Sequence, residues 1–211
     1  MLLSIEKRFV FVHIPKTAGQ SISAALAPWA VKTEKTQFRR LLSHLPVRED
    51  PTHAWPRPHG TARWLRHKLP ADMFDSYFKF AVVRNQFDFL VSYFHYLRQN
   101  ETSRRHADAL RWSFSEFLGY IGRKNRTNSV SQLSWITDAK GGMLVDDLLR
   151  FERLDEDFAR VLDRIGLGGA IALPHVNRTQ RKDYRDYYTA RDRKLVETMF
   201  ADDLRTLDYS F

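Results

Sequence analysis

Four residues near the N-terminus have side chains or backbones that suit phosphate binding: Lys16, Thr17, Gly19 and Ser21. The ammonium group of a lysine carries a full positive charge, and a hydroxyl group can donate a hydrogen bond to an anion. Glycine lets a ligand approach the backbone closely, and the N–H groups at the start of a helix point at an anion bound there. These residue types in this order predict a site for a phosphorylated nucleotide.

Two secondary-structure elements would hold this loop in place. Residues 9–12 are Phe-Val-Phe-Val, a short apolar run that is typical of an inner strand of a parallel sheet. Residues 21–26 would open a helix. An ordinary ATP-binding loop, G-x-x-x-x-G-K-[ST], has its lysine after the last glycine. Because Lys16 precedes Gly19 instead, the loop is not of that ordinary kind.

A second group of polar residues follows another apolar run, at 80–83. Apolar residues then recur at helical spacing over 87–97, which places Arg84 at the carboxyl end of a strand and Asp88 near a helix start. Ligands of open α/β sheets bind at that edge. The guanidinium group of Arg84 can bind a phosphate with two parallel hydrogen bonds, and Ser92 can add a hydroxyl donor.

Together the two motifs resemble those of sulfotransferases that use 3′-phosphoadenosine 5′-phosphosulfate (PAPS). In the carbohydrate-type branch, which includes heparan and chondroitin sulfotransferases, the loop reads roughly H-I-P-K-T-[AG]-G-[ST]-S. A later strand ends in V-R-N-P, with a serine eight residues after the arginine. The chain departs from this pattern at two positions. Gln20 stands where the family usually has Thr or Ser, and Gln86 stands where it usually has Pro. The resemblance implies that Arg84 and Ser92 bind the 3′-phosphate, and that the 5′-phosphosulfate is bound by Pro15, Lys16, Thr17, Ala18, Gly19, Gln20 and Ser21.

The resemblance also implies which residues would carry the chemistry. Lys16 would neutralise the charge that develops on the departing 5′-phosphate. A histidine ahead of the next helix commonly takes the acceptor's proton in this family, and His59 has that place, before a predicted short helix at 61–69. Imidazole, with an unperturbed pKa of ~6.5, is suited to this role. The alternatives are a His59 that only hydrogen-bonds to loop backbone, and an acidic residue as the base.

The resemblance continues into the C-terminal half of the chain with less specific motifs. Residues 144–154 are similar to the family's later strand, D-x-[IVL]-x-R-[FY]-E-x-L, and apolar residues over 154–165 then follow helical spacing. Residues 173–177 read L-P-H-V-N, like a loop that commonly closes over the nucleotide in the family. Arg181 and Lys182 are therefore candidate contacts of the nucleotide. The scheme requires no metal, because Lys16 and the loop amides take the part that Mg²⁺ has in nucleotide kinases.

Length and composition predict a single compact domain over residues 1–211, and the resemblance implies that this domain is sulfotransferase-like. A chain of 211 residues with 43% hydrophobic residues can bury a sizeable core, and no linker-like stretch divides it. We expect an α/β fold, with a P-loop-type parallel sheet flanked by helices and a largely helical middle section at 100–140. The chain has no cysteine, no apolar run long enough to span a membrane and no recognisable signal peptide. These features favour a cytoplasmic protein, of a bacterial or otherwise cytosolic form of the family.

The net charge of +9, from 34 Lys and Arg against 25 Asp and Glu, suits an anionic partner. The basic residues are scattered without a recognised nucleic-acid-binding module, so we expect no nucleic acid as a partner.

The reaction that the resemblance implies is sulfuryl transfer from PAPS to a hydroxyl or amine of an acceptor, with a carbohydrate as the expected acceptor. The alternatives are a P-loop nucleotide kinase or NTPase, and a non-catalytic binder of anionic polymers.

For the other histidine and tryptophan residues, a packing or surface role is considered beside a functional one. His13, at the end of a strand, is expected to order the phosphate loop rather than transfer protons. Trp55 and Trp64 flank the acceptor-side loop, where an aromatic ring could stack on a sugar, or simply pack. Surface or packing roles are expected for His44, His67, His95 and His106.

Overall fold

The computed structural model describes residues 1–32, 36–42, 44–45, 47–48, 50–52, 59–125, 130–169, 171–174 and 181–211. The chain forms two compact units. Unit 1 consists of Met1–Val83 and Trp135–Asn177, and unit 2 of Arg84–Ser134 and Arg178–Phe211. The units alternate along the chain, so a search for one linker in the sequence does not find their boundaries.

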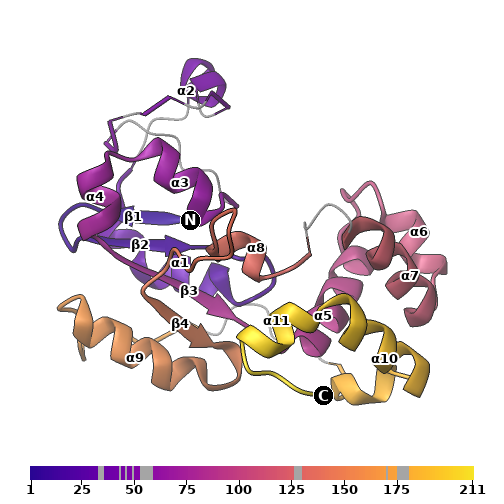
Figure 1. Ribbon diagram of the computed structural model, residues 1–211. Helices are drawn as coiled ribbons and strands as arrows, with labels where there is room; N and C mark the ends of the chain where they lie inside the picture. The colour runs from indigo at the N-terminus through magenta and orange to yellow at the C-terminus, as the bar shows by residue number, and fades with distance from the viewer. Residues whose placement is uncertain are drawn as a thin grey trace. The chain divides into compact units, whose positions relative to one another are not determined.

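Unit 1 contains a four-stranded sheet in the order β1-β2-β3-β4 (Figure 1). Strand β2 (Phe9–Val12) is parallel to β3 (Phe78–Val83), with Phe9 opposite Phe78, and β3 is parallel to β4 (Asp147–Arg150). Strand β1 (Leu2–Ser4) is an antiparallel edge strand paired with β2. The sheet is therefore mixed, with a parallel core as expected and an additional short edge strand that the sequence did not indicate.

One face of this sheet packs against two helices, α1 (Gly19–Leu26) and α9 (Leu154–Arg164). Alternate strand residues point to the same face, and Phe9, Phe11 and Phe80 share a buried cluster with side chains of both helices. Lys79 points to the opposite face, where its ammonium nitrogen lies 5.2 Å from the ring centroid of Phe74 in α4 (Ala71–Ser76). Helices thus flank both faces of the sheet, as the fold class predicts.

Unit 1 contains further short helices. They include η1 (Ala27–Trp29), α2 (Gln37–Leu42), α3 (Ala62–Lys68) and η2 (Phe151–Arg153). Helix α3 begins at the expected place because the Thr61 hydroxyl accepts a hydrogen bond from the backbone N–H of Trp64. Helix α8 (Leu133–Ile136) crosses the boundary between the units.

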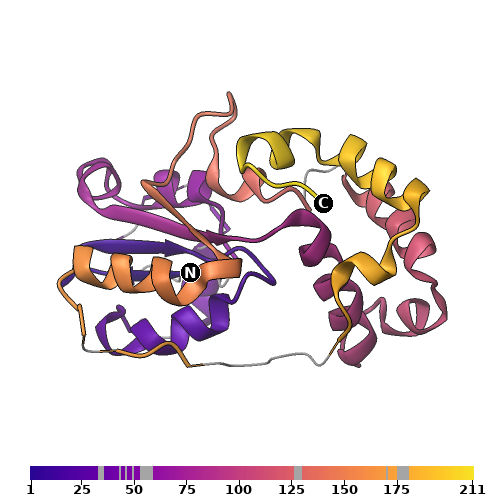
Figure 2. The same cartoon turned by 90° about the horizontal axis from the view of Figure 1, so that it is seen from below.

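Unit 2 is helical. It comprises α5 (Gln86–Gln99), α6 (His106–Arg111), α7 (Phe114–Asn125), η3 (Tyr184–Tyr187), α10 (Ala190–Met199) and α11 (Ala201–Thr206). Its core joins Phe87, Leu90 and Phe94 of α5 to Phe117 of α7 and Val196 of α10, and Figure 2 shows α10 in yellow alongside α7. None of the helices in the described part of the chain is long and apolar enough to cross a membrane.

Candidate functional site

The loop between β2 and α1 has an unusual backbone. Lys16 and Ala18 both have positive φ angles, of 66° and 61°, which L-residues other than glycine seldom adopt. The strain of such residues is of order 1–3 kcal/mol each and is concentrated at functional sites. Alternation between right- and left-handed conformations turns successive N–H groups toward one side and forms an anion-binding concavity. This backbone, with the Lys16 side chain, supplies donors and charge for a phosphate or sulfate group.

Thr17 holds this loop from within. Its side chain is completely buried, and its hydroxyl donates a hydrogen bond to the backbone carbonyl of Ile14 (2.9 Å). Because this hydroxyl donates its proton to Ile14, Thr17 would bind an anion through its backbone N–H. Pro15, Lys16 and Ala18 are half-buried, Gln20 is exposed and Ser21 is buried at the first turn of α1.

Gly19 is required by the imidazole ring of His13. A Cβ atom at position 19 would lie 1.8 Å from Cδ2 of His13 and 1.9 Å from its Nε2, which is far inside van der Waals contact. The ring also stacks on Phe11, with centroids 5.8 Å apart. Burial lowers the pKa of His13 to about 3, so the ring is neutral at physiological pH. His13 therefore packs beneath the loop as a neutral group, in agreement with the ordering role expected for it.

His59 lies beside the loop in the same unit. Its ring centroid is 4.7 Å from that of His13, and its ring meets the Trp135 ring edge-on, with centroids 6.3 Å apart. His59 is exposed, but surrounding atoms displace enough water to lower the pKa of its imidazole below the ordinary value, against the opposing effect of a hydrogen bond to the His13 backbone. The structure thus brings His59 to the phosphate loop as a largely unprotonated group at neutral pH.

In unit 2, the side-chain amide of Gln132 fixes the position of Arg84. Its Oε1 accepts a hydrogen bond from the backbone N–H of Arg84 (2.9 Å), and its Nε2 donates to the backbone carbonyl of Arg84 (2.7 Å). The same Nε2 lies 2.8 Å from Oε1 of Gln86, the residue that stands where the family has proline. Gln86 is buried, so this turn is held by hydrogen bonds of two glutamine side chains instead of by a proline ring.

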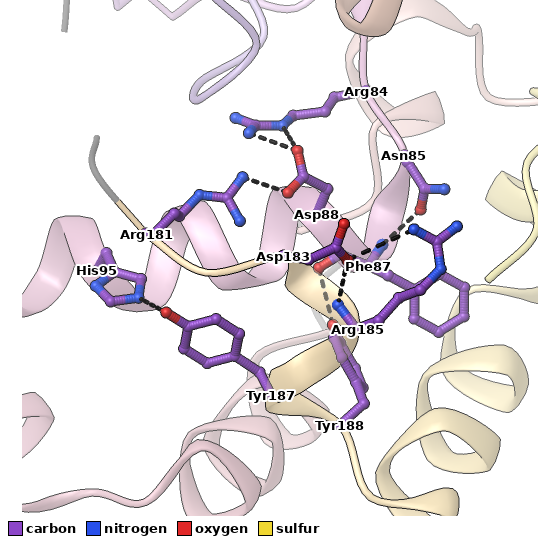
Figure 3. A network of polar contacts seen from close by, with 10 residues as sticks. All are labelled: Arg84, Asn85, Phe87, Asp88, His95, Arg181, Asp183, Arg185, Tyr187 and Tyr188. Atoms are coloured by element: carbon purple, nitrogen blue, oxygen red, sulfur yellow. Dashed lines mark hydrogen bonds and ion pairs between the residues drawn. The ribbon is translucent and has the colours of Figure 1, made fainter. Parts of the chain in front are cut away.

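The guanidinium group of Arg84 is paired with the carboxylate of Asp88 (Figure 3). Nε of Arg84 donates to Oδ2 of Asp88 (2.6 Å), and its Nη2 lies 2.5 Å from the same oxygen. The other oxygen of Asp88, Oδ1, accepts from Nη2 of Arg181. Ser92 follows Asp88 by four residues in α5, so it lies one turn along the same helix face. The predicted residues Arg84, Ser92 and Arg181 thus lie in one unit, and Arg84 and Arg181 share a carboxylate whose role the sequence did not indicate.

The guanidinium group of Arg181 has a second terminal nitrogen beside the one that pairs with Asp88. Its Nη1 atom is buried and has no hydrogen-bond partner within the described part of the chain. A buried donor without a partner costs about 1–3 kcal/mol, so an incoming anion would relieve this cost. Lys182, the neighbouring candidate, is exposed.

The other residues singled out in the sequence lie elsewhere or pack. His95 has an unexpected partner, because its Nε2 lies 2.8 Å from the Tyr187 hydroxyl, and burial followed by the charges of Arg181 and Arg98 lowers its pKa. His106 contacts the backbone carbonyl of Leu97. His44 and His67 are exposed. Trp55 and residues 175–177 of the L-P-H-V-N segment lie outside the described residues.

Comparison with known proteins agrees with these features. The model of the family described as "Sulfotransferase family" matches residues 1–210. Among curated proteins, no sequence matches the chain. Among solved structures, the fold resembles the crystal structure of mouse sulfotransferase SULT7A1 complexed with PAP, with a TM-score of 0.56 and 16% sequence identity over 95% of this chain and 84% of that one. A likeness at this level of identity establishes the fold.

Proposed function

We propose that this chain, which belongs to the sulfotransferase family, transfers a sulfuryl group from PAPS to a hydroxyl or amine of an acceptor, with a carbohydrate as the acceptor class. The observation that carries the proposal is the loop after β2, where two left-handed residues, Lys16 and Ala18, shape the backbone for an anion. The mouse sulfotransferase with a similar fold was crystallised with PAP, the product that PAPS leaves after transfer.

The 5′ end of the donor is assigned to residues 15–21. Backbone N–H groups of the loop and of the first turn of α1 would bind the phosphosulfate oxygens, and Lys16 would balance their charge. During transfer, negative charge grows on the 5′-phosphate as it leaves. A fixed ammonium group at that place stabilises the transition state more than the ground state, which is what raises the rate of the chemical step.

The 3′-phosphate is assigned to Arg84 and Ser92, with Arg181 and Lys182 as further contacts. Arg84 and Arg181 are held by one carboxylate, and the buried Nη1 of Arg181 is unpartnered among the described residues. A phosphate monoester at neutral pH carries a charge of about −1.5 to −2. It would pair with two guanidinium groups through charge-assisted hydrogen bonds.

The reaction requires one proton transfer and no net redox change. The acceptor oxygen forms a bond to sulfur while the bond from sulfur to the bridging oxygen of the 5′-phosphate breaks, which yields the sulfated acceptor and PAP. The acceptor loses its proton to His59, whose imidazole lies beside the loop through its contact with His13. Because the pKa of His59 is below its ordinary value, the ring is ready to accept that proton at neutral pH.

The carbohydrate acceptor is supported by two features of the chain. The first is the resemblance of the H-I-P-K-T-A-G loop to the carbohydrate-type branch. The second is Trp135, a half-buried indole whose ring lies against His59. Aromatic rings beside a catalytic base are suited to stack on the apolar face of a sugar.

Calorimetric titration tests the donor. PAP should bind far more tightly than AMP, which lacks the 3′-phosphate, and more tightly than ADP or ATP with Mg²⁺. Equal affinities for PAP and AMP, or a preference for ATP with Mg²⁺, would contradict the sulfotransferase assignment, the latter in favour of a nucleotide kinase. The acceptor is then tested with ³⁵S-labelled PAPS against unsulfated heparosan and chondroitin, with a phenol such as 2-naphthol as the non-carbohydrate control.

A further inference from the structure

We propose that Asp88 is a positioning residue for the donor's 3′-phosphate, an inference that rests on the function proposed above. Its carboxylate bridges two guanidinium groups that lie 93 residues apart in the sequence, those of Arg84 and Arg181. The three side chains are largely buried, with exposed fractions of 7% for Arg84, 14% for Asp88 and 13% for Arg181. Figure 3 shows both guanidinium groups directed at the one carboxylate.

Asp88 can position both arginines because each of its two carboxylate oxygens binds a different one. Oδ2 is occupied by Arg84 and Oδ1 by Arg181, so each arginine is held through its own oxygen. A free arginine side chain has several rotatable bonds, and fixing it in one conformation costs rotamer entropy. Asp88 fixes both side chains before the ligand arrives, and preorganisation of this kind raises affinity.

The charge of the cluster favours an anion. The three side chains of this largely buried cluster, two guanidinium groups and one carboxylate, together carry a formal charge of +1. The unpartnered Nη1 of Arg181 is a donor left over after Asp88 is bound. A 3′-phosphate can receive it without displacing Asp88, so the carboxylate supports phosphate binding instead of competing with it.

On α5, Asp88 lies one helical turn before Ser92. Arg84, Asp88 and Ser92 follow one another at intervals of four residues, and Asp88 and Ser92 therefore lie on one face of the helix. Arg181, which comes from a remote segment, is brought to this face by Asp88 alone among the ion pairs of the described chain. The motif at 84–92 thus supplies two of the proposed phosphate donors, Arg84 and Ser92. The ion pair with Asp88 adds Arg181 as the third.

The proposal is tested with Asp88→Asn, titrated by calorimetry with PAP and with AMP. The asparagine oxygen can hold one arginine, but its NH₂ group repels the other, so one guanidinium group is released. Removal of one partner from a buried, hydrogen-bonded charge pair is costly, and the affinity for PAP should fall roughly 10- to 100-fold. The affinity for AMP should change less than about twofold, because AMP has no 3′-phosphate to contact the cluster.

Two further variants separate positioning from folding. Asp88→Glu keeps the charge but moves the carboxylate outward by one methylene group, and it should weaken PAP binding less than Asp88→Asn while leaving AMP binding unchanged. In an Arg181→Ala background, Asp88→Asn should have a much smaller additional effect on PAP affinity, because the two residues act together. Asp183→Asn is the matched control, since Asp183 is exposed and pairs with Arg185 on the surface.

The outcomes distinguish this inference from the proposed function. A wild-type protein that binds PAP and AMP equally would overturn both. A wild-type protein that prefers PAP, with Asp88→Asn and Asp88→Glu retaining that preference undiminished, would overturn the inference alone. Equal losses of PAP and AMP affinity in the Asp88 variants would also overturn it, because they would assign Asp88 to the fold rather than to the 3′-phosphate.

Discussion

The side chain of Gln132 pairs with Arg84 through both backbone polar groups of that arginine, at 2.9 Å and 2.7 Å. The side-chain amide thereby forms the two hydrogen bonds that a residue of a neighbouring strand would form, just after the end of β3. Gln132 is itself held, because its backbone N–H donates to Oδ1 of Asp203 (2.6 Å). A buried chain of hydrogen bonds therefore fixes the backbone from which the Arg84 side chain extends.

We predict that Gln132→Ala is strongly destabilising. The change leaves the buried N–H and carbonyl of Arg84 without this partner, at about 1–3 kcal/mol for each orphaned group. The free energy of unfolding in urea should fall by roughly 2–4 kcal/mol. Gln99→Ala, at an exposed glutamine in the last turn of α5, should change it by less than about 0.5 kcal/mol. A Gln132→Ala protein as stable as the Gln99 control would show that the backbone of Arg84 is fixed by other contacts.

Local pattern accounts for the elements that the sequence predicted. The runs at 9–12 and 80–83 and the helical spacing over 87–97 are each contained in one segment, and they appear as β2, the end of β3 and α5. Strand β1 was missed because three residues, Leu2–Ser4, are too few to show a period. The 3₁₀ helix at 184–187 likewise has no periodic signature.

Contacts between distant segments account for what the sequence could not predict. Gln132 with Arg84, Trp135 with His59, and Arg181 with Asp88 each join residues that are far apart along the chain. Nothing in the types or local spacing of these residues marks them as partners. Arg84 and Ser92 could be proposed from the sequence because strand, arginine, helix and serine follow one another within one short motif. The bridging carboxylate of Asp88 could not be, because its second partner comes from the C-terminal segment.

Arg84→Lys should weaken PAP binding although it keeps the positive charge. Lysine cannot reproduce the planar, forked donors that bind a carboxylate and a phosphate together. We expect a loss of PAP affinity of roughly 10- to 100-fold, with Ser92→Ala losing about 3- to 10-fold for one neutral hydroxyl donor. Arg193→Lys, at an exposed arginine paired with Glu197, should leave the affinity unchanged. If Arg84→Lys bound PAP like the wild type in the same calorimetric series, Arg84 would not be the 3′-phosphate ligand.

Gly19→Ala should damage the phosphate loop through His13. The new methyl group would lie 1.8 Å from the imidazole, and a rigid ring cannot give way without leaving its stack on Phe11. We expect a loss of about 1–3 kcal/mol in stability together with weaker PAP binding. The His13→Ala background removes the clash, so the same substitution should cost much less stability there. An equal cost in both backgrounds would locate the damage in the backbone of α1 instead.

Replacement of Lys16 separates transition-state stabilisation from backbone strain. Lys16→Ala and Lys16→Gly both remove the ammonium group, and each should lower turnover by roughly 100-fold or more while PAP still binds. Only the glycine variant relieves the positive φ of 66°, so it should be more stable than the alanine variant by about 1 kcal/mol in urea unfolding. Wild-type turnover in either folded variant would refute the role of Lys16, and a loss confined to PAP affinity would make it a ground-state ligand.

His59→Ala tests the base, and the structure sharpens the expected pH dependence. Loss of a general base should cut turnover by about 100- to 10,000-fold with PAP affinity nearly intact. In the wild type, protonation of His59 abolishes the base. The atoms around the ring displace water and lower its pKa, so the rate should rise with pH through a pKa below the ordinary ~6.5 of histidine and be level at neutral pH. His67→Ala, at an exposed histidine on α3, is the control. A histidine that only supports the His13 backbone would behave differently: its loss would lower the melting temperature and leave the pH profile of the remaining activity unchanged.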